Sequence, residues 1–541
     1  MKDVIAMEEN ARTAEGLRFG CPGCGSGLRY DIASGQMHCD NCGQSYDLTA
    51  LPDPSRQDGE GMMEAQEYRC PQCGAAVHTS QTAAASFCSY CGADVLLTQR
   101  LTRIRRPSQV VPFSVTREQC EQIYRRRVQA ARYAPDDFVA QETLDHFRPV
   151  YIPFWRYKGK AAGDQLAGSA THRHSDSRYD YTDQYSYTVA GNVAVGGVIY
   201  DASVSFEDET ARQLAFSIQH TKPFHAGYLC GFYAESPDTE PSLYEDGLRE
   251  YARNAWNDEF SKQCKYNDAK VAFPDADFTA EAELILMPVW LLAHRSGGRV
   301  VYTAVNGDSG QIVCDTPVSN RRFAVLTAEL AAMTLAVLLL LHFLFILRPR
   351  LLAALCGMTL TVAQWIIARV FRDIRIRRLR ENDPTWLRLH PDPRTGKIKK
   401  PAKVGSRSAG WFIPLLITGV ISLIGAVFTY FDAYNTNAFL ASLISDHGWL
   451  APVIQLCALV LFLIPGFRRR TLVDDALYFA RLALLAVTLV TAFVASTDMV
   501  FYQCGLGQLI LTAVALARLN GAHNEFVSRP VPFFNEGGEQ A

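Results

Sequence analysis

The chain has 541 residues, of which 48% are hydrophobic and 20% charged, and its 53 basic residues nearly balance its 55 acidic ones. This length is enough for several domains, and a net charge of −2 indicates no particular class of partner. The sequence contains no G-x-x-x-x-G-K-[ST], H-E-x-x-H, G-x-S-x-G or dinucleotide fingerprint. This argues against a nucleotide-driven motor and leaves no candidate constellation for an enzyme.

Eight of the 15 cysteines form two copies of the pattern C-x2-C-x14-C-x2-C, and each cysteine of the second copy lies 49 residues after its counterpart. The copies are Cys21, Cys24, Cys39 and Cys42, then Cys70, Cys73, Cys88 and Cys91. Two thiolates separated by two residues reach one metal ion from a tight turn, and two such turns provide the four ligands of a tetrahedral site. We predict two structural Zn²⁺ ions, one in each of two zinc ribbons.

Two other roles for these cysteines fit the pattern less well. A disulfide framework belongs to oxidising compartments, and Met1 to Gly16 is polar, without the apolar core of a secretory signal. A single C-x-x-C is typical of a thioredoxin-like redox pair, but four pairs at two identical spacings are not. We therefore expect reduced, zinc-loaded cysteines in the cytoplasm.

Residues 99–320 are predicted to form a soluble α+β domain. Thr116 and Gln119 form a capping box that begins a helix with one apolar face. The segment Tyr151-Ile152-Pro153-Phe154-Trp155 resembles Leu286-Met287-Pro288-Val289-Trp290. This repetition predicts two related halves whose tryptophans pack in the core, and proline within a strand indicates an edge or a bulge.

The last 220 residues contain apolar runs near the length of about 20 residues that spans a bilayer. We predict six transmembrane helices, at 323–347, 351–370, 411–431, 449–467, 477–496 and 500–517. Within the fifth of these, Arg481 would have to reach an interface. The predicted fold class is multidomain: two tandem zinc ribbons, a soluble α+β domain and an all-α transmembrane bundle.

Basic residues predict the orientation of these helices. The loop 372–410 holds twelve Lys or Arg against four Asp or Glu, whereas 432–448 holds no Lys or Arg. We therefore expect both termini in the cytoplasm of a bacterium, with the helices in its inner membrane. Five arginines of the loop are also predicted to attract anionic lipid headgroups, namely Arg372, Arg375, Arg377, Arg378 and Arg380.

The predicted domain boundaries follow from these features. They are a first ribbon at 17–49, a linker at 50–65, a second ribbon at 66–98, the α+β domain at 99–320, a transmembrane hairpin at 321–371, the basic loop at 372–410, four transmembrane helices at 411–518 and a cytoplasmic tail at 519–541.

Two further motifs resemble functional sites but have a simpler interpretation. His172 and His174 lie on one side of a predicted strand, and no carboxylate or cysteine neighbour at ligand spacing reinforces them, so we interpret them as a solvated strand end. Gly307-Asp308-Ser309-Gly310 matches part of a protease nucleophile motif, but it lacks the following Gly-Pro, which favours a hairpin turn.

An ordered set of motifs runs along residues 20–350. It comprises the CPxCG knuckles at 21–25 and 70–74, then 111–113, 151–155, 288–290, 304–310 and 317–319. In this set the chain resembles the bacterial membrane proteins described as TFIIB-type zinc ribbon-containing, some of which are miscalled primosomal helicase-like. The resemblance implies a membrane partner of flotillin-like (SPFH) proteins or of the phage-shock membrane-stress coat.

We therefore expect a non-enzymatic inner-membrane protein that recruits a cytoplasmic protein partner, such as a flotillin-like or membrane-stress scaffold. Two alternatives stay open. One is a membrane-tethered nucleic-acid-binding protein, against which the scarcity of Lys and Arg in the ribbons argues. The other is a ribbon-gated channel or transporter, against which the scattered polar residues of the predicted spans argue.

Overall fold

The computed structural model describes most of the chain between residues 19 and 530. The described residues are 19–325, with gaps at 57–60, 80–87, 93–97, 177, 205, 264–269, 275–277 and 297–298, then 453–461, 476–494, 498–530 and short helical pieces between 328 and 365. The predicted span at 411–431 and the five arginines between 372 and 380 lie outside the described residues, as do most of the spans at 323–347 and 351–370.

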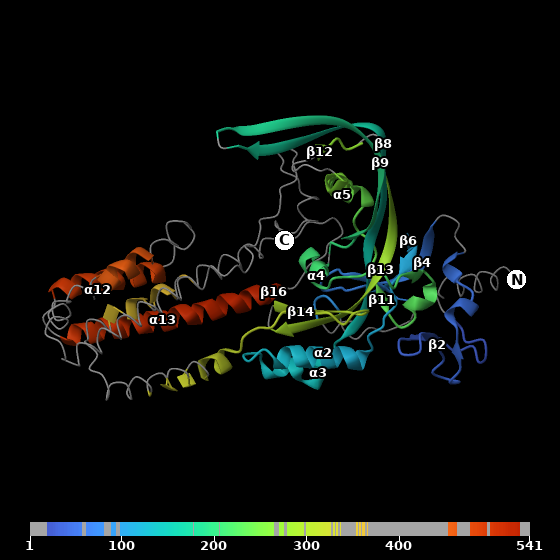
Figure 1. Cartoon of the computed structure of the whole chain (residues 1–541). Helices are drawn as coiled ribbons and strands as arrows, with labels where there is room; N and C mark the ends of the chain where they lie inside the picture. Colours follow the sequence, from blue (N-terminus) through green and yellow to red (C-terminus); the bar gives the residue numbers. More distant parts are fainter. Residues whose placement is uncertain are drawn as a thin grey trace.

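The described strands belong to two sheets (Figure 1). The small antiparallel sheet contains β1 (Arg29–Asp31), β2 (Gln36–His38) and β3 (Ser45–Tyr46). The large sheet contains 13 strands, namely β4 (Met62–Arg69), β5 (Ala76–Thr79), β6 (Thr98–Arg105), β7 (Gln109–Val110), β8 (Arg148–Ser175), β9 (Asp180–Asp201), β10 (Lys222–Pro223), β11 (Tyr233–Ala234), β12 (Lys270–Val271), β13 (Thr279–Ser296), β14 (Arg299–Asn306), β15 (Ile312–Cys314) and β16 (Arg529–Pro530). The α-helices named here are α2 (Arg117–Gln129), α3 (Gln141–Leu144), α4 (Asp208–Gln213), α5 (Glu245–Gln263), α12 (Ala476–Val494) and α13 (Asp498–Val527).

The predicted fold class is wrong in its membrane part. The described residues contain no six-helix transmembrane bundle, and one helix among them, Met499–Glu525 within α13, is long and apolar enough to cross a membrane. The apolar part of α12, Phe479–Thr491, is shorter than the roughly 20 residues required. Apolar composition misled the prediction because it does not show which side chains pack inward: Arg481 and Gln508 are buried.

The predicted fold class is also wrong in treating the second cysteine repeat as a separate small β unit. β4 pairs with β5 and β6, and β5 pairs in turn with β11, so the strands of this repeat extend the large sheet. The order along the sheet is β10-β7-β13-β8-β11-β5-β4-β6. The two residues of β11 provide this connection, and they lie far from the cysteines in the sequence.

The antiparallel pair β8–β13 lies at the centre of the large sheet and relates two halves, β7-α2-β8-β9 and β11-α5-β13-β14. Ile152 lies opposite Met287 at the middle of this arrangement. β8 pairs first with β11, at 150–151, and then with β9 from Phe154 onward. β13 pairs in the same way with β7, at 285–286, and then with β14 from Val289 onward. The repeated motif of the sequence thus corresponds to a repeated pairing pattern.

The two prolines of the repeated motif lie where the neighbouring strand changes. Pro153 falls between the β11 and β9 pairings of β8, and Pro288 between the β7 and β14 pairings of β13. A missing N–H breaks no ladder hydrogen bond at such a junction. The prediction of an edge or a bulge is therefore wrong, because both prolines lie in central strands.

Both tryptophans of the repeated motif are core residues, as predicted. Trp155 and Trp290 are 2% and 4% exposed. The indole N–H of Trp155 donates to the Thr239 carbonyl at 3.0 Å, and that of Trp290 donates to the Val115 carbonyl at 2.9 Å. Thr239 precedes α5 and Val115 precedes α2, so each tryptophan ties its strand to the helix entry of the other half.

The helix predicted from Thr116 and Gln119 is confirmed as α2. The Gln119 amide donates to Thr116 Oγ1, and the Thr116 amide donates to Gln119 Oε1, which completes the capping box. Cys120, Tyr124 and Val128 are buried at four-residue spacing. This face joins the core formed with β13 and β14.

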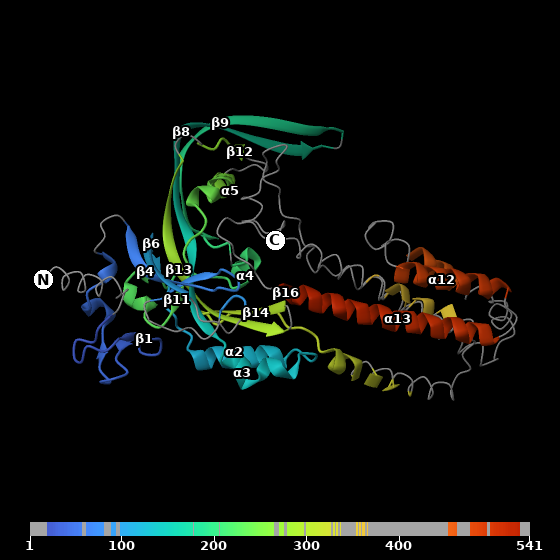
Figure 2. The same ribbon diagram turned by 180° about the vertical axis from the view of Figure 1, so that it is seen from behind.

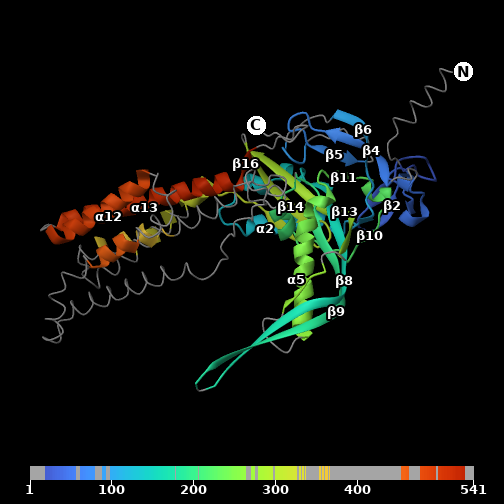
Figure 3. The same ribbon diagram turned by 90° about the horizontal axis from the view of Figure 1, so that it is seen from above.

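Beyond the last pairing with β13, β8 and β9 continue as an arm, formed by the paired residues 161–175 and 180–193 and the tip between them (Figures 1 and 3). The two residues of β12 also pair with β8 within the arm, at 168–169. α5 packs at the base of the arm, where Trp256 is buried beside Val195. Three tyrosines near the tip, Tyr179, Tyr181 and Tyr185, are 66%, 41% and 38% exposed. The arm therefore projects aromatic side chains away from the body of the sheet.

The carboxyl end of α13 is joined to the large sheet by β16, which pairs with the start of β14. Arg299 on β14 donates to Ser528 Oγ at 2.7 Å and to the Glu525 carbonyl at 2.6 Å. The Asn524 amide group exchanges two hydrogen bonds, of 2.7 and 2.8 Å, with the backbone of Val318. Figure 2 shows α13 running from this junction away from the sheet beside α12.

β9 and β14, the last strands of the two halves, each end at a buried polar residue, Asp201 and Asn306 respectively. The two are equivalent because each lies opposite the residue that follows the proline of the repeated motif. Asp201 Oδ1 accepts the Ser203 amide at 2.9 Å, and Asn306 Oδ1 accepts the Asp308 amide at 2.9 Å. Asp201 is the ionisable member of the pair. Its burial raises the pKa of its carboxyl group well above the usual value.

We predict that Asp201→Asn flattens the pH dependence of stability. Because the folded pKa is raised, the folded protein keeps a proton that the unfolded chain releases above about pH 4, so wild-type stability falls as pH rises from there through the folded pKa. Asparagine keeps the acceptor and cannot ionise. Between pH 5 and pH 8, the free energy of unfolding of wild type should therefore fall by about 1 kcal/mol or more relative to that of Asp201→Asn.

The measurement is unfolding of the intact chain in detergent, followed by circular dichroism at both pH values. Asp164→Asn, an exposed carboxyl on β8, is the matched control and should follow the wild-type profile. Identical pH profiles for Asp201→Asn and wild type would contradict the burial argument.

Candidate metal centres

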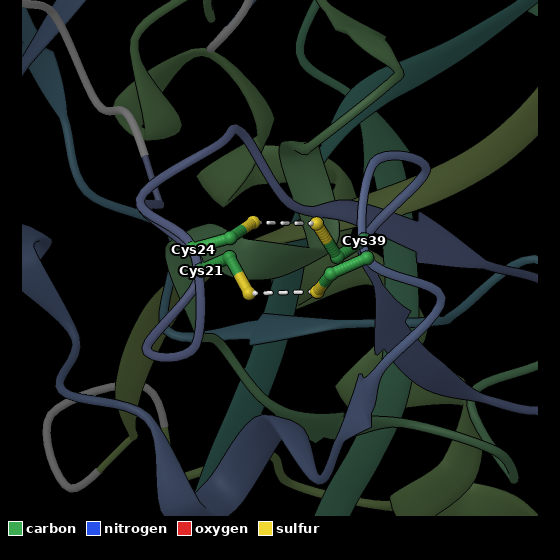
Figure 4. A group of neighbouring side chains, drawn as sticks. Cys21, Cys24 and Cys39 are labelled. Carbon is green, nitrogen blue, oxygen red and sulfur yellow. Dashed lines mark hydrogen bonds between the residues drawn. The ribbon is translucent and has the colours of Figure 1, made fainter.

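The first cysteine repeat forms a cluster between two tight turns beside the small sheet (Figure 4). The Sγ atoms of Cys21 and Cys42 are 3.5 Å apart, as are those of Cys24 and Cys39. Four sulfurs around a tetrahedral ion at about 2.3 Å would be about 3.8 Å apart, whereas a disulfide bond is about 2.05 Å. The four cysteines are free, and their spacing fits a closed metal site.

The second repeat forms an equivalent cluster within the large sheet. Cys70 and Cys73 lie in the turn between β4 and β5, and their Sγ atoms are 3.8 Å from Cys91 and 3.7 Å from Cys88 respectively. In each repeat the sulfur atoms lie within 4.8 Å of one another. The structure therefore brings the eight predicted cysteines into two four-cysteine clusters that could hold two metal ions.

Each turn of the clusters closes on a glycine with a left-handed backbone, which glycine adopts without steric cost. These glycines are Gly25, Gly43, Gly74 and Gly92, with φ between 63° and 77°. In each turn the glycine amide donates to the carbonyl of the first cysteine, at 2.8 to 3.0 Å. Gly92 is doubly constrained, because a Cβ there would lie 2.9 Å from the Ala293 carbonyl.

Hydrogen bonds lower the thiol pKa of Cys21 and Cys24 in the first cluster and of Cys70 in the second, and so favour their thiolate forms. The Ser26 side chain, together with its backbone amide, lowers the pKa of the Cys24 thiol to about 6. In the second cluster, the Cys88 side chain lowers the pKa of the Cys70 thiol to about 6. Thiolates are the form that binds metal ions, so each cluster contains a side chain ready to ligate near neutral pH.

The two clusters differ in exposure. Cys24 and Cys42 of the first cluster are exposed, whereas all four cysteines of the second are buried. The second cluster also contacts the centre of the sheet: the Tyr302 hydroxyl on β14 donates to the Tyr90 carbonyl, and Arg295 on β13 donates to the Gln72 side chain at 3.2 Å. Opening the second cluster therefore requires disturbing β13 and β14.

The structure also reveals a group that the sequence analysis missed. His172 and His174 on β8 lie close to Asp183 on β9, and the ligand atoms of the three lie within 4.8 Å of one another. The strand that carries the histidines gives no signal of this group, because Asp183 lies on β9. Pairing the predicted strands across the arm would have found Asp183, which lies directly opposite His172.

Comparison with known proteins identifies one relative. No family model matches the chain, and no solved structure matches it. The uncharacterized protein YdjG of Bacillus subtilis (strain 168) is 30% identical over 329 residues, which cover 59% of this chain and 95% of YdjG. The chain belongs to the YdjG family. YdjG is named as an uncharacterized protein, so this membership adds no chemistry to the two cysteine clusters.

We predict that a chelator removes metal from the two clusters in two separate phases. The first cluster should lose its ion faster, because two of its ligands are exposed, whereas all four ligands of the second are buried. The measurement is elemental analysis of the intact chain after timed exposure to EDTA and gel filtration, with about one ion lost in each phase.

Two variants assign the phases. Cys24→Ser should abolish the fast phase and leave the slow one, and Cys73→Ser should do the reverse and also lower the unfolding temperature, because its cluster lies within the large sheet. Loss of both ions in a single phase from the wild-type chain would contradict the difference between the clusters.

Proposed function

We propose that this protein is a non-enzymatic zinc-ribbon protein that is anchored in the bacterial inner membrane and holds a cytoplasmic protein partner there. The observation that carries the proposal is the attachment of α13 to β14 through β16, because β14 also contacts the second cysteine cluster. Metal cluster, sheet and apolar helix thus form one connected structure.

Zinc is the proposed ion in both clusters because the ligand set is four cysteines with tetrahedral spacing. A catalytic zinc site keeps one position open for water or substrate, whereas each of these clusters fills all four positions with sulfur. The proposed role of zinc is therefore structural. Its binding free energy would hold together the turns that join β4 to β5 and precede β6.

A membrane anchor is supported by the surface of α13. A core helix of a soluble protein is mostly buried, but only 28% of the most apolar 18-residue stretch of α13 is buried. Large apolar side chains are exposed along it, including Leu506, Leu509 and Ile510, at 60%, 50% and 55%. An apolar surface of this length is costly in water and favourable in a bilayer.

The proposed cytoplasmic location of the ribbons rests on two arguments. Free cysteines at metal-binding spacing suit a reducing compartment. The carboxyl end of α13 returns to the sheet that carries the second cluster, so residues 528–530 and the cluster lie on the same side of any membrane that α13 crosses.

The arm is the proposed surface for the protein partner. Tyrosine is enriched at protein interfaces because it contributes a large apolar ring and a polar hydroxyl at low entropic cost. Tyr179 and Tyr181 combine high exposure with a position at the tip of a paired hairpin. A flotillin-like or membrane-stress scaffold is the partner class that the sequence resemblance implies.

We predict that Ile510→Arg reduces membrane association. An arginine near the middle of a membrane helix costs about 2.5–3.5 kcal/mol, and the side chain of Ile510 is exposed on the apolar surface of α13. The measurement is the fraction of the chain in the membrane pellet after carbonate extraction. Tyr251→Arg, at a 50% exposed position on α5, is the matched control and should stay in the pellet as wild type does.

Equal membrane association of Ile510→Arg and wild type would contradict anchoring by α13, and so would recovery of the wild-type chain in the carbonate supernatant.

We predict that Tyr179→Ser combined with Tyr181→Ser reduces partner recovery by about tenfold or more, the scale expected when interface anchors are removed. The measurement is quantitative mass spectrometry of proteins co-isolated with the intact chain after mild detergent extraction. Tyr251→Ser tests whether loss of any exposed tyrosine has the same effect, and it should retain the partner.

Recovery of no protein with the wild-type chain, or equal recovery with the double variant, would contradict the proposed role of the arm. Tight retention of nucleic acid that weakens steeply with salt would instead favour the nucleic-acid alternative.

A further inference from the structure

The arm places two imidazoles and one carboxylate on the same face of a β-hairpin. His172 and His174 are two residues apart on β8, so their side chains point to the same side of the strand. Asp183 on β9 lies directly opposite His172. In an antiparallel pair, directly opposite and diagonal neighbours on one face are close enough to interact, and Asp183 is the diagonal neighbour of His174.

The distances between these groups are near those of a shared ion. Asp183 Oδ2 lies 3.8 Å from His172 Nδ1 and 3.6 Å from His174 Nδ1. Two ligand atoms bound at about 2.0–2.1 Å to a tetrahedral zinc ion would be about 3.3 Å apart. The ligand atoms of all three residues lie within 4.8 Å of one another, so small rotations of these exposed side chains would bring them to ligating distance.

The orientation of the rings is partly fixed before any ion binds. The His172 and His174 rings are stacked with centroids 5.1 Å apart, and the His174 ring also stacks on Tyr181 at 5.0 Å. His174 is thus held between two rings on the backbone of a paired hairpin. Arg173, whose positive charge would oppose a cation, lies between the histidines in sequence and alternates to the other face.

The donor set identifies the kind of ion. Imidazole nitrogen with one carboxylate oxygen suits borderline divalent transition metals such as Zn²⁺, Ni²⁺ and Cu²⁺ rather than Ca²⁺ or Mg²⁺, which prefer oxygen ligands. We propose that His172, His174 and Asp183 form a third metal site, which takes a divalent transition-metal ion and leaves its remaining positions to water. The site is separate from both cysteine clusters and differs from them in ligand chemistry.

The three side chains are 44% to 47% exposed, so the site is open to solvent and exchanges its ion faster than the cysteine clusters do. The same three groups without an ion would form an ordinary surface contact between histidine and aspartate, worth little in stability. Uptake of a metal ion beyond those in the two cysteine clusters would indicate a metal site, whereas an ordinary surface contact would take up none.

The test uses the intact, untagged chain in detergent, with both cysteine clusters metal-loaded and free metal removed by gel filtration. Titration with Zn²⁺ in an isothermal calorimeter should show one further ion bound per chain. His172→Ala and Asp183→Asn should each weaken this uptake about tenfold or more. Asp180→Asn, a carboxylate of the same hairpin outside the group, is the matched control and should bind the ion as wild type does.

Unfolding temperatures without added Zn²⁺ should be unchanged in all three variants, because the altered side chains are exposed. Lowering the pH should release the third ion, since the ligands must be deprotonated to bind. The proposal is overturned if the wild-type chain takes up no ion beyond the two in the cysteine clusters, or if Asp180→Asn weakens uptake as much as Asp183→Asn does.

Discussion

The contact of the second cysteine cluster with β13 and β14 is the interaction on which the arrangement of this protein depends. Tyr302 donates to the backbone of the cluster, and Gly92 leaves no room for a side chain against Ala293. β14 also pairs with β16 at the end of α13. Metal binding by four buried thiolates would therefore stabilise the same strand that receives the apolar helix.

The paired halves of the large sheet explain how this strand is positioned. β8 and β13 pair around Ile152 and Met287. Each of them also pairs in parallel with a short strand of the other half, β8 with β11 and β13 with β7. The tryptophans of the repeated motif donate hydrogen bonds to the backbone just before the helix of the opposite half. Each half therefore contributes to the core of the other. The two halves differ in the length of their last strand: β9 is much longer than β14 and forms the arm with β8.

Local patterns in the sequence predicted the parts that local chemistry determines. The cysteine spacing predicted both clusters, the capping box predicted α2, and the Pro-x-Trp repeat predicted the core tryptophans. Pairings between distant segments had no such signal: two residues of β11 join the second repeat to the sheet, and Asp183 meets His172 only across the arm. The predicted span at 500–517 falls within the apolar helix Met499–Glu525, but the described residues contain no six-helix bundle. Apolar length alone does not distinguish a helix packed on its neighbours from one that crosses a membrane.

The central claim is that two metal-closed cysteine clusters belong to a body anchored by α13. Elemental analysis of intact chain extracted from membranes, after thorough dialysis against metal-free buffer, tests it most directly. The account predicts two tightly held zinc ions per chain and eight cysteines that react with a thiol reagent only after the zinc is removed. Fewer than two ions, or cysteines paired as disulfides, would contradict it.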